Sequence, residues 1–577
     1  MTTNQKENSK AGPNPLVRFV PILGWLPKYD RSWLTPDILA GLTLWGLVVP
    51  EGMAYAGVAG LPPQMGLYTL LVALLVYALF GSSRHLAVGA TSATAALIAG
   101  TVIALGAKPS DMVTYQAYAV ALVLVVGVVF LVAGLARIGF VTQFLSKPVM
   151  DGFVAGLGIF VAVGQLNKLF GVEKGEGNTL VKLFHVIVQL PQANLVTFAV
   201  GISALALLFL LPRWNKKIPA GLVVLFGYII LSSVLQLSAN YGVAVAGKLP
   251  QGLPSLALPK APLAVMAAMI LPAIGIFLVA YSEALGVARE FAEKHGYEVD
   301  PDQELTAHAA TNIVSALFGG MIAAGSMSAS AVKDGAGARS QVTNLVAWGV
   351  TLVTLLFLTP LFTSLPEAVL AALIIHAVWH IISARKLQQV RLVSRTEFWF
   401  ALIAFLGVIL IDVLQGMIIG LLCSLIYTVY KSSRHLSSLG RVPGLPGAFS
   451  DLIRHPEDTA VPGVLILRLD APMYFANALT VREMMKTLVE ESETPLHSVI
   501  FDATVQDELD ITSAEVLKGV VKEMQGKSIA VYVAELHAPV REFSRRTGLL
   551  DQIGEKNVFA TVNLAVDFIE TSALGRR

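Results

Sequence analysis

Charged residues are scarce in this chain of 577 residues: Asp, Glu, Lys and Arg make up 14%, whereas hydrophobic residues make up 55%. A soluble domain of ordinary composition carries far more charge. The one cysteine, Cys423, excludes a disulfide within the chain and any cysteine-based metal site. The first thirty residues lack a compact apolar stretch with a small-residue cleavage site, so we expect no secretory signal peptide. The scarcity of charge and a mean hydropathy of +0.69 place the chain in a lipid bilayer.

The common signatures of enzymes are also missing. The sequence shows no nucleotide-binding loop of the type Gly-x-x-x-x-Gly-Lys and no convincing pair of nucleophile and base. The formal charge of +2 gives no information about partners. We expect no enzymatic activity, no cofactor, no metal site and no nucleic acid partner.

Long apolar runs recur from about Leu34 to Tyr430. A helix needs roughly 20 residues to cross a hydrocarbon core of about 30 Å. The Gly, Pro and Lys/Arg residues between the runs favour helices over the weak period-two pattern of a β-barrel. We expect fourteen spans, near residues 36–56, 66–81, 86–105, 114–135, 148–167, 192–212, 218–237, 263–287, 304–320, 322–337, 343–362, 365–384, 397–413 and 415–430.

Basic residues concentrate in alternate loops, with Arg84, Arg137 and Arg289 on the same expected side. Cytoplasmic loops carry an excess of Lys and Arg, which places the N-terminus inside the cell. An even number of spans then returns the C-terminus to the same side. The expected location is the inner (cytoplasmic) membrane, crossed many times, with both termini in the cytoplasm.

A seven-residue phrase occurs twice, as Gly89-Ala-Thr-Ser-Ala-Thr-Ala95 and as Gly325-Ser-Met-Ser-Ala-Ser-Ala331. The two copies lie 236 positions apart (325 minus 89), in the third and tenth expected spans. Seven spans in each half give the halves opposite orientations, which is the inverted-repeat architecture of many secondary transporters. Chance recurrence is the alternative in a chain rich in Gly, Ala, Ser and Thr.

The repeated phrase has the chemistry of an anion site. If the chain is extended through Val88 and Gly89 and helical after Thr91, the unpaired N–H groups of the first turn point into the middle of the protein. Together with the helix dipole they hold phosphate, sulfate or carboxylate groups. The expected substrate-binding residues are Glu51, Tyr55, Thr91, Ser92, Ser326, Met327, Ser328 and Ala329.

Each half also carries one carboxylate deep in an apolar run, Glu51 in the first span and Glu283 in the eighth. An intramembrane carboxylate is costly and usually faces a cavity or a partner, although either residue can instead lie hydrated at the interface. We expect Glu283, with Ser282, to bind the coupling H⁺ or Na⁺. Lys333 and Asp334 follow the second phrase, and we interpret them as the cytoplasmic end of a helix, with an internal ion pair as the alternative.

The character of the sequence changes after Tyr430. Clean alternation predicts strands at 464–469, 497–501 and 528–534, with helices at 479–490, 512–524 and 539–553. This pattern is typical of a small α/β sheet covered by helices. The expected parts are an N-terminal segment (1–33), a transmembrane domain (34–432), a linker (433–455) and a soluble domain (456–577).

Several motifs resemble the SulP family of anion permeases: Pro50-Glu-Gly-Met-Ala-Tyr-Ala56, Phe80-Gly-Ser-Ser-Arg-His-Leu-Ala-Val-Gly89, Asp302-Gln-Glu-Leu305 and Gly335-Ala-Gly-Ala-Arg-Ser-Gln341. The resemblance implies an α-helical fold of fourteen spans as a 7+7 inverted repeat. In it a core domain (spans 1–4 and 8–11) moves against a gate domain (5–7 and 12–14), with the anion between the third and tenth spans. It also implies a homodimer.

The same resemblance makes the C-terminal region a cytoplasmic STAS domain, regulatory rather than catalytic and open to a cytoplasmic protein partner. Thr512, in Asp510-Ile-Thr-Ser513, lies where such domains often carry a modifiable hydroxyl, but this segment is also typical of a simple helix N-cap.

Two positions depart from the family pattern: Glu51 stands where glutamine is frequent, and Ala329 where arginine is frequent. Sulfate is the family's usual substrate, but these changes favour bicarbonate, or a dicarboxylate carried with cations. We therefore expect a secondary active transporter of a small anion of the sulfate, bicarbonate or dicarboxylate class, working as an H⁺ or Na⁺ symporter by an elevator-like mechanism. The alternatives are a nucleobase permease of similar fold and an anion-sensing receptor that signals through the STAS domain.

Overall fold

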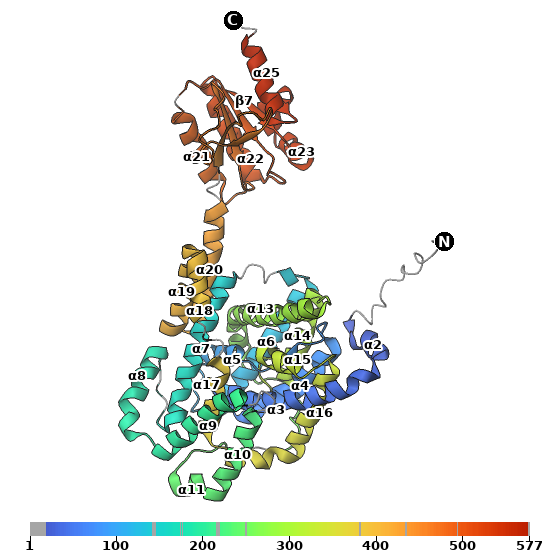
Figure 1. Ribbon diagram of the computed structural model, residues 1–577, viewed down its shortest axis with the longest axis vertical. Helices are drawn as coiled ribbons and strands as arrows, with labels where there is room; N and C mark the ends of the chain where they lie inside the picture. The colour runs from blue at the N-terminus through green and yellow to red at the C-terminus, as the bar shows by residue number, and fades with distance from the viewer. Residues whose placement is uncertain are drawn as a thin grey trace, which may run out of the picture. The chain divides into compact units, whose positions relative to one another are not determined.

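The computed structural model describes residues 19–140, 146–173, 175, 177–214, 220–247, 251–379, 382, 384–432, 436–492 and 494–574. Its chain forms two compact units, Met1–Leu422 and Cys423–Arg577. The first unit is helical and the second contains a larger sheet (Figure 1). Each unit has its own buried apolar cores.

Every expected span coincides with a helix, or with a strand and the helix that follows it. The corresponding elements, in order, are α3 (Leu34–Val58), α4 (Pro63–Phe80), β1 (Ala87–Gly89) with α5 (Ser92–Ala104), α6 (Met112–Leu135), α7 (Lys147–Phe170), α9 (Leu195–Trp214), α10 (Ala220–Leu235), α13 (Ile270–His295), α14 (Pro301–Leu317), β2 (Ala324–Ser326) with α15 (Met327–Gly335), α16 (Val342–Val353) with η5 (Thr354–Leu358) and η6 (Thr359–Ser364), α17 (Glu367–Trp379), α19 (Arg395–Leu410) and α20 (Val413–Ser432).

Short helices lie between these elements or before them. They are α2 (Ile22–Trp25), η1 (Leu26–Lys28), η2 (Arg31–Trp33), α8 (Thr179–Gln189), η4 (Leu190–Gln192), α11 (Leu237–Tyr241), α12 (Leu263–Ala268) and α18 (Ala384–Val393). Residues 1–18 of the expected N-terminal segment lie outside the described residues.

Helix ends follow the local chemistry of the sequence. Asp300 caps α14 by accepting hydrogen bonds from the N–H groups of Asp302 and Gln303, and Pro301 occupies the first helical position. Gly171 and Gly296 end α7 and α13 with φ of +67° and +66°, a conformation that glycine adopts at little cost.

Seven helical segments among the described residues are long and apolar enough to cross a membrane. Shorter apolar helices include α5, α10 and α17. In α5 and α15 the shortness has a physical cause, because an extended strand forms the first part of each expected span. Fourteen crossings therefore remain a prediction.

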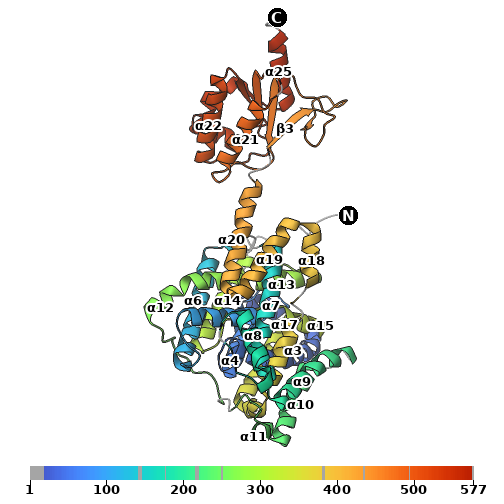
Figure 2. The ribbon, with the colours of Figure 1, turned by 90° about the vertical axis from the view of Figure 1, so that its left-hand side faces the viewer.

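Contacts between helices repeat with a pseudo-twofold pattern. The pair α6–α14 corresponds to α16–α4, the pair α3–α16 to α13–α6, and the pair α7–α19 to α17–α9. In each correspondence a helix of one half takes the place of its counterpart in the other half. The helices fall into two groups, one of α3–α6 with α13–α16 and the other of α7, α9 and α10 with α17 and α19 (Figures 1 and 2). This arrangement agrees with the expected inverted repeat and its two bundles.

The C-terminal unit contains a six-stranded sheet of order β4-β3-β5-β6-β7-β8. Strands β5 to β8 are parallel, and β3 and β4 are antiparallel to their neighbours. One apolar cluster includes residues of α21, α22 and α24, and a second includes residues of α25. The elements are β3 (Leu436–Arg441), β4 (Phe449–Asp451), β5 (Val464–Leu469), α21 (Ala478–Glu490), β6 (Ser498–Asp502), α22 (Ile511–Gly526), β7 (Ala530–Ala534), α23 (Ala538–Arg546), α24 (Leu549–Ile553), η7 (Glu555–Asn557), β8 (Val558–Phe559) and α25 (Val562–Leu574).

Two local expectations for this unit were wrong. The segment 433–455 is more than a linker, since β3 and β4 belong to the sheet and Leu436 pairs with Leu469. The serines and glycines of this segment do not predict strands. Strand formation here depends on pairing with neighbouring strands more than on intrinsic propensity. The helix expected at 539–553 is broken at Gly548, where φ is +74°.

Candidate anion-binding site

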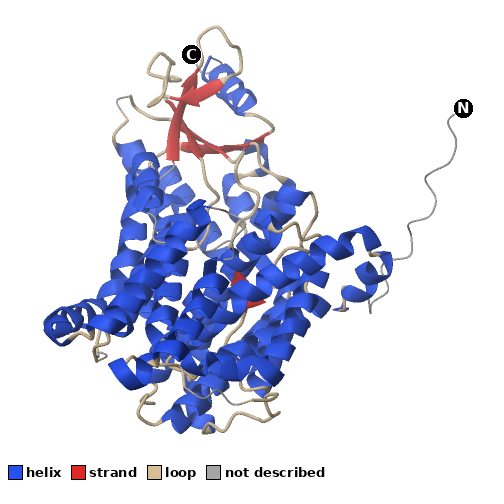
Figure 3. Ribbon diagram, turned by 60° about the horizontal axis from the view of Figure 1, so that its bottom comes forward, coloured by secondary structure: helices blue, strands red, loops and turns tan. Residues whose placement is uncertain are grey.

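The two copies of the repeated phrase meet in space. Strands β1 and β2 pair antiparallel, with Ala87 opposite Ser326, Val88 opposite Gly325 and Gly89 opposite Ala324. Figure 3 shows this short pair of strands among the surrounding helices. A Cβ atom added at Gly325 would lie 2.6 Å from Cα of Ala284, so the strand approaches α13 more closely than a side chain permits.

A helix begins directly after each strand. Thr91 caps α5, and its hydroxyl accepts a hydrogen bond from the N–H of Thr94 in a reciprocal capping box. Ser326 caps α15 by accepting from the N–H of Ala329 at 3.2 Å. The other N–H groups of each first turn have no acceptor within their own helix. Two helix N-termini therefore start from one pair of strands, as the sequence predicted.

Glu304 and Gln341, from two of the sequence motifs, hold the chain that leads into β1. The Glu304 carboxylate accepts hydrogen bonds from the N–H of Ser82 at 2.8 Å and from the Tyr77 hydroxyl at 2.8 Å. The Gln341 amide donates to the carbonyl groups of Ser83 at 2.7 Å and Leu86 at 2.9 Å. Because Glu304 and Gln341 are buried, these bonds fix the strand without competition from water.

The two carboxylates lie crosswise between the halves. Glu51 of α3 interacts with the Ser328 side chain of α15, and Glu283 of α13 interacts with the Thr91 side chain before α5. Each repeat therefore supplies a carboxylate to the helix N-terminus of the other. The correspondence is approximate, because Thr91 precedes the first residue of α5, whereas Ser328 lies within the first turn of α15.

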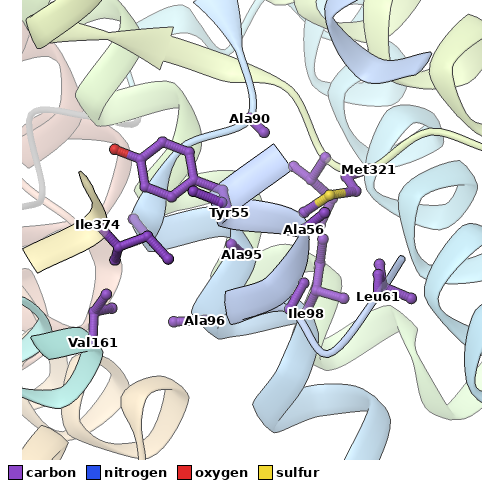
Figure 4. Packing of buried hydrophobic residues seen from close by; sticks show 14 of the residues in the cluster. Tyr55, Ala56, Leu61, Ala90, Ala95, Ala96, Ile98, Val161, Met321 and Ile374 are labelled. Atoms are coloured by element: carbon purple, nitrogen blue, oxygen red, sulfur yellow. The ribbon is translucent and has the colours of Figure 1, made fainter. Parts of the chain in front are cut away.

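Tyr55 joins both halves of this arrangement. Its ring is buried, with 6% of the residue exposed, and its hydroxyl interacts electrostatically with Glu51 and Glu283. In Figure 4 the Tyr55 ring projects from α3 toward Ile374, while Ala95 and Ala96 of α5 lie close to α3. Small alanines permit this close packing of helices in a membrane.

Glu283 and Ser282 carry buried oxygens without partners. Oε2 of Glu283 and Oγ of Ser282 make no hydrogen bond with any described residue. Oxygen atoms of this kind satisfy the needs of a bound proton or a hard cation. Glu283 and Ser282 are the residues expected to bind the coupling ion, and that role stays a prediction.

The expected substrate-binding residues divide into two sets. Three of these residues are exposed or partly exposed. Met327, which is 40% exposed, and Ser328 form the exposed side of the first turn of α15, and Ser92 is partly exposed on α5. Ala329 is only 2% exposed and faces the protein interior. Ser326 lies between these sets, with its hydroxyl 3.1 Å from that of Ser328.

Lys333 and Asp334 lie in the last turn of α15, as interpreted from the sequence, but their surroundings differ. Lys333 is fully buried and donates to Oδ1 of Asn344 at 3.0 Å. Asp334 accepts from Lys294 at 2.6 Å and contacts His295 at 2.6 Å. They form no internal pair with each other, and Lys333 does not mark a hydrated helix end. Side chains of adjacent helical residues point in different directions, which separates the two charges.

Sequence reasoning missed a charged contact within the second group of helices, at the place where that group meets α3. Lys168 of α7 and Glu367 of α17 form an ion pair of 3.1 Å beside a cavity of about 140 Å³ that Met53 and Gly57 of α3 also line. A Cβ atom added at Gly57 would lie 3.3 Å from Nζ of Lys168. Only the spatial approach of α3, α7 and α17 brings these residues together.

One cluster has the composition of a metal centre. Ligand atoms of His85, His295 and Asp334 lie within 4.8 Å of one another. They already have other partners, since His85 contacts the Tyr297 hydroxyl and the Ala338 carbonyl, each at 3.2 Å, and Asp334 binds Lys294. These contacts describe a polar network that joins α13 to α15.

In the C-terminal unit, Asp510 is the N-cap of α22, which confirms that interpretation of the segment. Its carboxylate accepts hydrogen bonds from the N–H groups of Ser513 at 2.7 Å and Phe475 at 2.5 Å. Thr512 is exposed, whereas Ser513 is fully buried. Thr512 is therefore the hydroxyl of this segment that a modifying enzyme can reach.

Comparison with known proteins places these features in a family. The model of the sulfate permease family matches residues 34–404, and that of the STAS domain matches residues 455–565. The chain belongs to the sulfate permease family. The match confirms the SulP resemblance of the sequence motifs and the STAS character of the C-terminal unit.

Individual relatives of the sulfate permease family match over most of the chain. A "Probable sulfate transporter" of Mycobacterium tuberculosis is 34% identical over 551 residues, which cover 94% of this chain and 98% of the relative. The structure of the murine anion transporter Solute Carrier 26 family member A9 in the inward-facing state shares the fold, with a TM-score of 0.89 at 22% identity and coverage of 98% and 96%. The transmembrane domain of a cyanobacterium bicarbonate transporter, BicA, covers 69% of this chain and 98% of its own length, with a TM-score of 0.59 at 22% identity.

These comparisons establish a multi-pass membrane protein of an anion transporter family. Its members are transporters rather than enzymes, and the fold is that expected from the inverted repeat.

Proposed function

We propose that this protein is a secondary active transporter of a small anion of the sulfate, bicarbonate or dicarboxylate class, driven by symport of H⁺ or Na⁺. The observation that carries the proposal is the crosswise site, in which two helix N-termini leave one strand pair and each lies beside a carboxylate of the other repeat. Membership in the sulfate permease family supports the substrate class.

The anion binds at the first turns of α5 and α15. Backbone N–H groups and the hydroxyls of Ser92 and Ser328 donate to it, and the two helix dipoles stabilise its charge. Met327 and Tyr55 provide apolar contact beside these donors. A site made of dipoles and hydroxyls binds an anion reversibly, because no arginine in the first turn of α15 clamps it.

The coupling cation offsets the negative charge that accumulates in the site. Glu51 and Glu283 together with a bound anion would place several negative charges in a medium of low dielectric constant, where their repulsion is strong. A proton or Na⁺ on Glu283 relieves that repulsion, and the unpartnered oxygens of Glu283 and Ser282 provide its ligands. Anion and cation therefore bind together.

Movement of the core bundle against the gate bundle carries the site across the membrane. The site lies on helices of one contact group, whereas Lys168 and Glu367 belong to the other. The small residue Gly57 lies where α3 meets this ion pair, and small residues permit helices to slide past one another. An elevator-like motion requires a surface of this kind, along which the core bundle can slide past the gate bundle.

The remaining assignments follow from the same architecture. We place the protein in the inner membrane as a homodimer with both termini in the cytoplasm, and we assign the STAS domain a regulatory role through a cytoplasmic protein partner. Exposed Thr512 is the modifiable hydroxyl of that domain.

Uptake by purified protein in liposomes tests the proposal. Radiolabelled sulfate, bicarbonate, fumarate and aspartate are offered separately under an inward H⁺ gradient and under an inward Na⁺ gradient. The expected result is accumulation of at least one anion that depends on one of the two gradients. A receptor would bind an anion without net flux, and a nucleobase permease would accumulate radiolabelled uracil instead.

A further inference from the structure

Lys333 is a buried charge inside the core bundle. Its relative exposure is 0%, and it is the one lysine or arginine in the described ranges that is buried. It lies on α15, the helix whose N-terminus forms half of the anion site. Burial of an ammonium group is costly in a membrane protein unless the charge serves a purpose.

The contacts of Lys333 do not neutralise it. Its ammonium donates to the neutral amide oxygen of Asn344, and no carboxylate oxygen of a described residue lies within 4.0 Å of it. Asp37 is the carboxylate that interacts with Lys333 at longer range. That carboxylate already accepts hydrogen bonds from several donors, including the N–H of Arg339 at 2.7 Å and the Ser340 hydroxyl at 2.6 Å. Lys333 therefore has no direct ion-pair partner among the described residues.

Helix geometry directs this charge toward the anion site. Lys333 follows Ala329 by four residues, so the two side chains share the buried face of α15. Side chains on a helix lean toward its N-terminus, and a lysine side chain spans about one helical turn. The Asn344 amide that accepts from Lys333 also donates to the Leu86 carbonyl, directly before β1. From the rise of about 1.5 Å per residue, the ammonium lies on the order of 10 Å from the first turn of α15.

We propose that Lys333 supplies the fixed positive charge of the anion site and sets its preference for anions by their charge. The inference rests on the proposed function, since it assigns a specificity-determining residue to the same site. Glu51 and Glu283 lie beside the site and contribute negative charge, and Lys333 acts from behind α15 without contacting the anion. Because the interaction is electrostatic, its effect grows with the number of charges on the anion.

A charge about 10 Å away, acting through an effective dielectric constant of about 20, changes a binding constant by on the order of tenfold for each charge on the ligand. Removal of the Lys333 charge should then weaken sulfate binding by on the order of 100-fold and nitrate binding by about tenfold. A purely structural role would weaken both anions by similar factors.

The test measures binding of sulfate and nitrate to the full chain in lipid nanodiscs by titration calorimetry. Lys333→Gln removes the charge and keeps a donor for Asn344, Lys333→Arg keeps the charge, and Lys333→Gln combined with Ala329→Arg moves a charge one turn along the same face. Lys294→Gln, at an exposed lysine of α13, is the matched control. Thermal unfolding and size-exclusion chromatography establish that each variant folds.

The expected result is a selective loss of sulfate affinity in Lys333→Gln, near-normal affinity in Lys333→Arg and Lys294→Gln, and recovery of sulfate affinity in the double variant. Equal losses for both anions, or no recovery in a folded double variant, would overturn the assignment. If Lys333→Gln does not fold, Asn344→Asp decides, since a carboxylate at the acceptor that lies 3.0 Å from the Lys333 ammonium offsets its charge and should weaken sulfate more than nitrate; equal effects on both anions would overturn the assignment. Absence of binding of either anion to the unmodified protein would instead contradict the proposed function.

Discussion

The Glu51 carboxylate of the first repeat interacts with the Ser328 side chain in the first turn of the half-helix of the second repeat. Glu283 and Thr91 repeat this relationship with the halves exchanged. A carboxylate thus lies beside each N-terminus at which an anion is expected to bind. Anion binding must either displace these carboxylates or accompany their neutralisation, which ties transport to a cation.

Glu283→Gln should abolish gradient-driven uptake while anion binding and anion exchange persist. The neutral amide copies the protonated form of the carboxyl group but can neither release a proton nor bind Na⁺ strongly. Uptake under an imposed gradient and counterflow exchange, measured on the same liposomes, distinguish these activities. We expect uptake to fall at least tenfold and exchange to change by less than about threefold, the scale of a modest change in binding.

Glu293→Gln provides the control for this experiment, because Glu293 lies on the same helix α13 but is exposed. It should retain normal coupling. Unchanged H⁺ or Na⁺ coupling in Glu283→Gln would remove Glu283 from the mechanism.

Ser328→Phe should block anion binding. The phenyl ring would occupy the open side of α15, where Ser328 is exposed beside Met327. Val132→Phe adds similar bulk at a position of α6 that is 60% exposed, and it should bind normally. Isothermal titration with sulfate compares the variants, and an unchanged affinity in Ser328→Phe would place the anion elsewhere.

Gly325→Ala should destabilise the core bundle by about 1–3 kcal/mol and reduce transport, as other overpacked sites do. The added methyl would lie 2.6 Å from Cα of Ala284, so β2 or α13 must move. Gly349→Ala is the matched control, because a Cβ atom there meets nothing within 4 Å. Thermal unfolding in detergent measures both. Equal unfolding temperatures for Gly325→Ala and Gly349→Ala would contradict the close contact between β2 and α13.

The helices could be predicted from the sequence. A long apolar run in a membrane must satisfy its own backbone hydrogen bonds, and a helix does so. The sequence also indicated an extended chain at Val88 and Gly89 with a helix after Thr91, since hydroxyl residues after glycine favour an N-cap. The similar offsets between the two glutamates (232 positions) and between the two phrases (236 positions) indicated a common site.

Long-range relationships were beyond the sequence. Nothing local shows that Glu51 reaches Ser328 rather than Ser92, or that Lys168 meets Glu367, because such pairs depend on packing of whole helices. The burial of Lys333 was misjudged for a related reason: charge near a helix end usually signals a hydrated loop. Strand β3 was not predicted, because pairing with the neighbouring strand β5, rather than the β propensity of its own residues, makes this segment a strand.

Asp510→Ala should loosen the start of α22 in the STAS domain by about 1 kcal/mol, the usual cost of a lost N-cap. Hydrogen exchange of the full chain should show faster exchange at Thr512 and Ser513, whereas Asp507→Ala, at an exposed aspartate, should leave these amides protected. Equal protection in both variants would contradict the capping role.

Acid should have a similar effect on this cap. Burial alone would raise the pKa of Asp510, but hydrogen bonds from backbone N–H groups of Ser513 and Phe475 outweigh it and lower the pKa below its ordinary value of 3.8. A carboxyl group whose pKa falls on folding stabilises the folded state above its unfolded pKa, and this stabilisation is lost as the pH falls through the folded pKa. Protection of the first turn of α22 should therefore decrease below about pH 3.8 in the unmodified protein and not in Asp510→Ala.

The most direct measurement is net uptake of a radiolabelled anion by the unmodified protein in liposomes, with the H⁺ and Na⁺ gradients imposed one at a time. The account predicts accumulation above equilibrium that one gradient drives and that Glu283→Gln abolishes. Anion binding without accumulation under either gradient would contradict it.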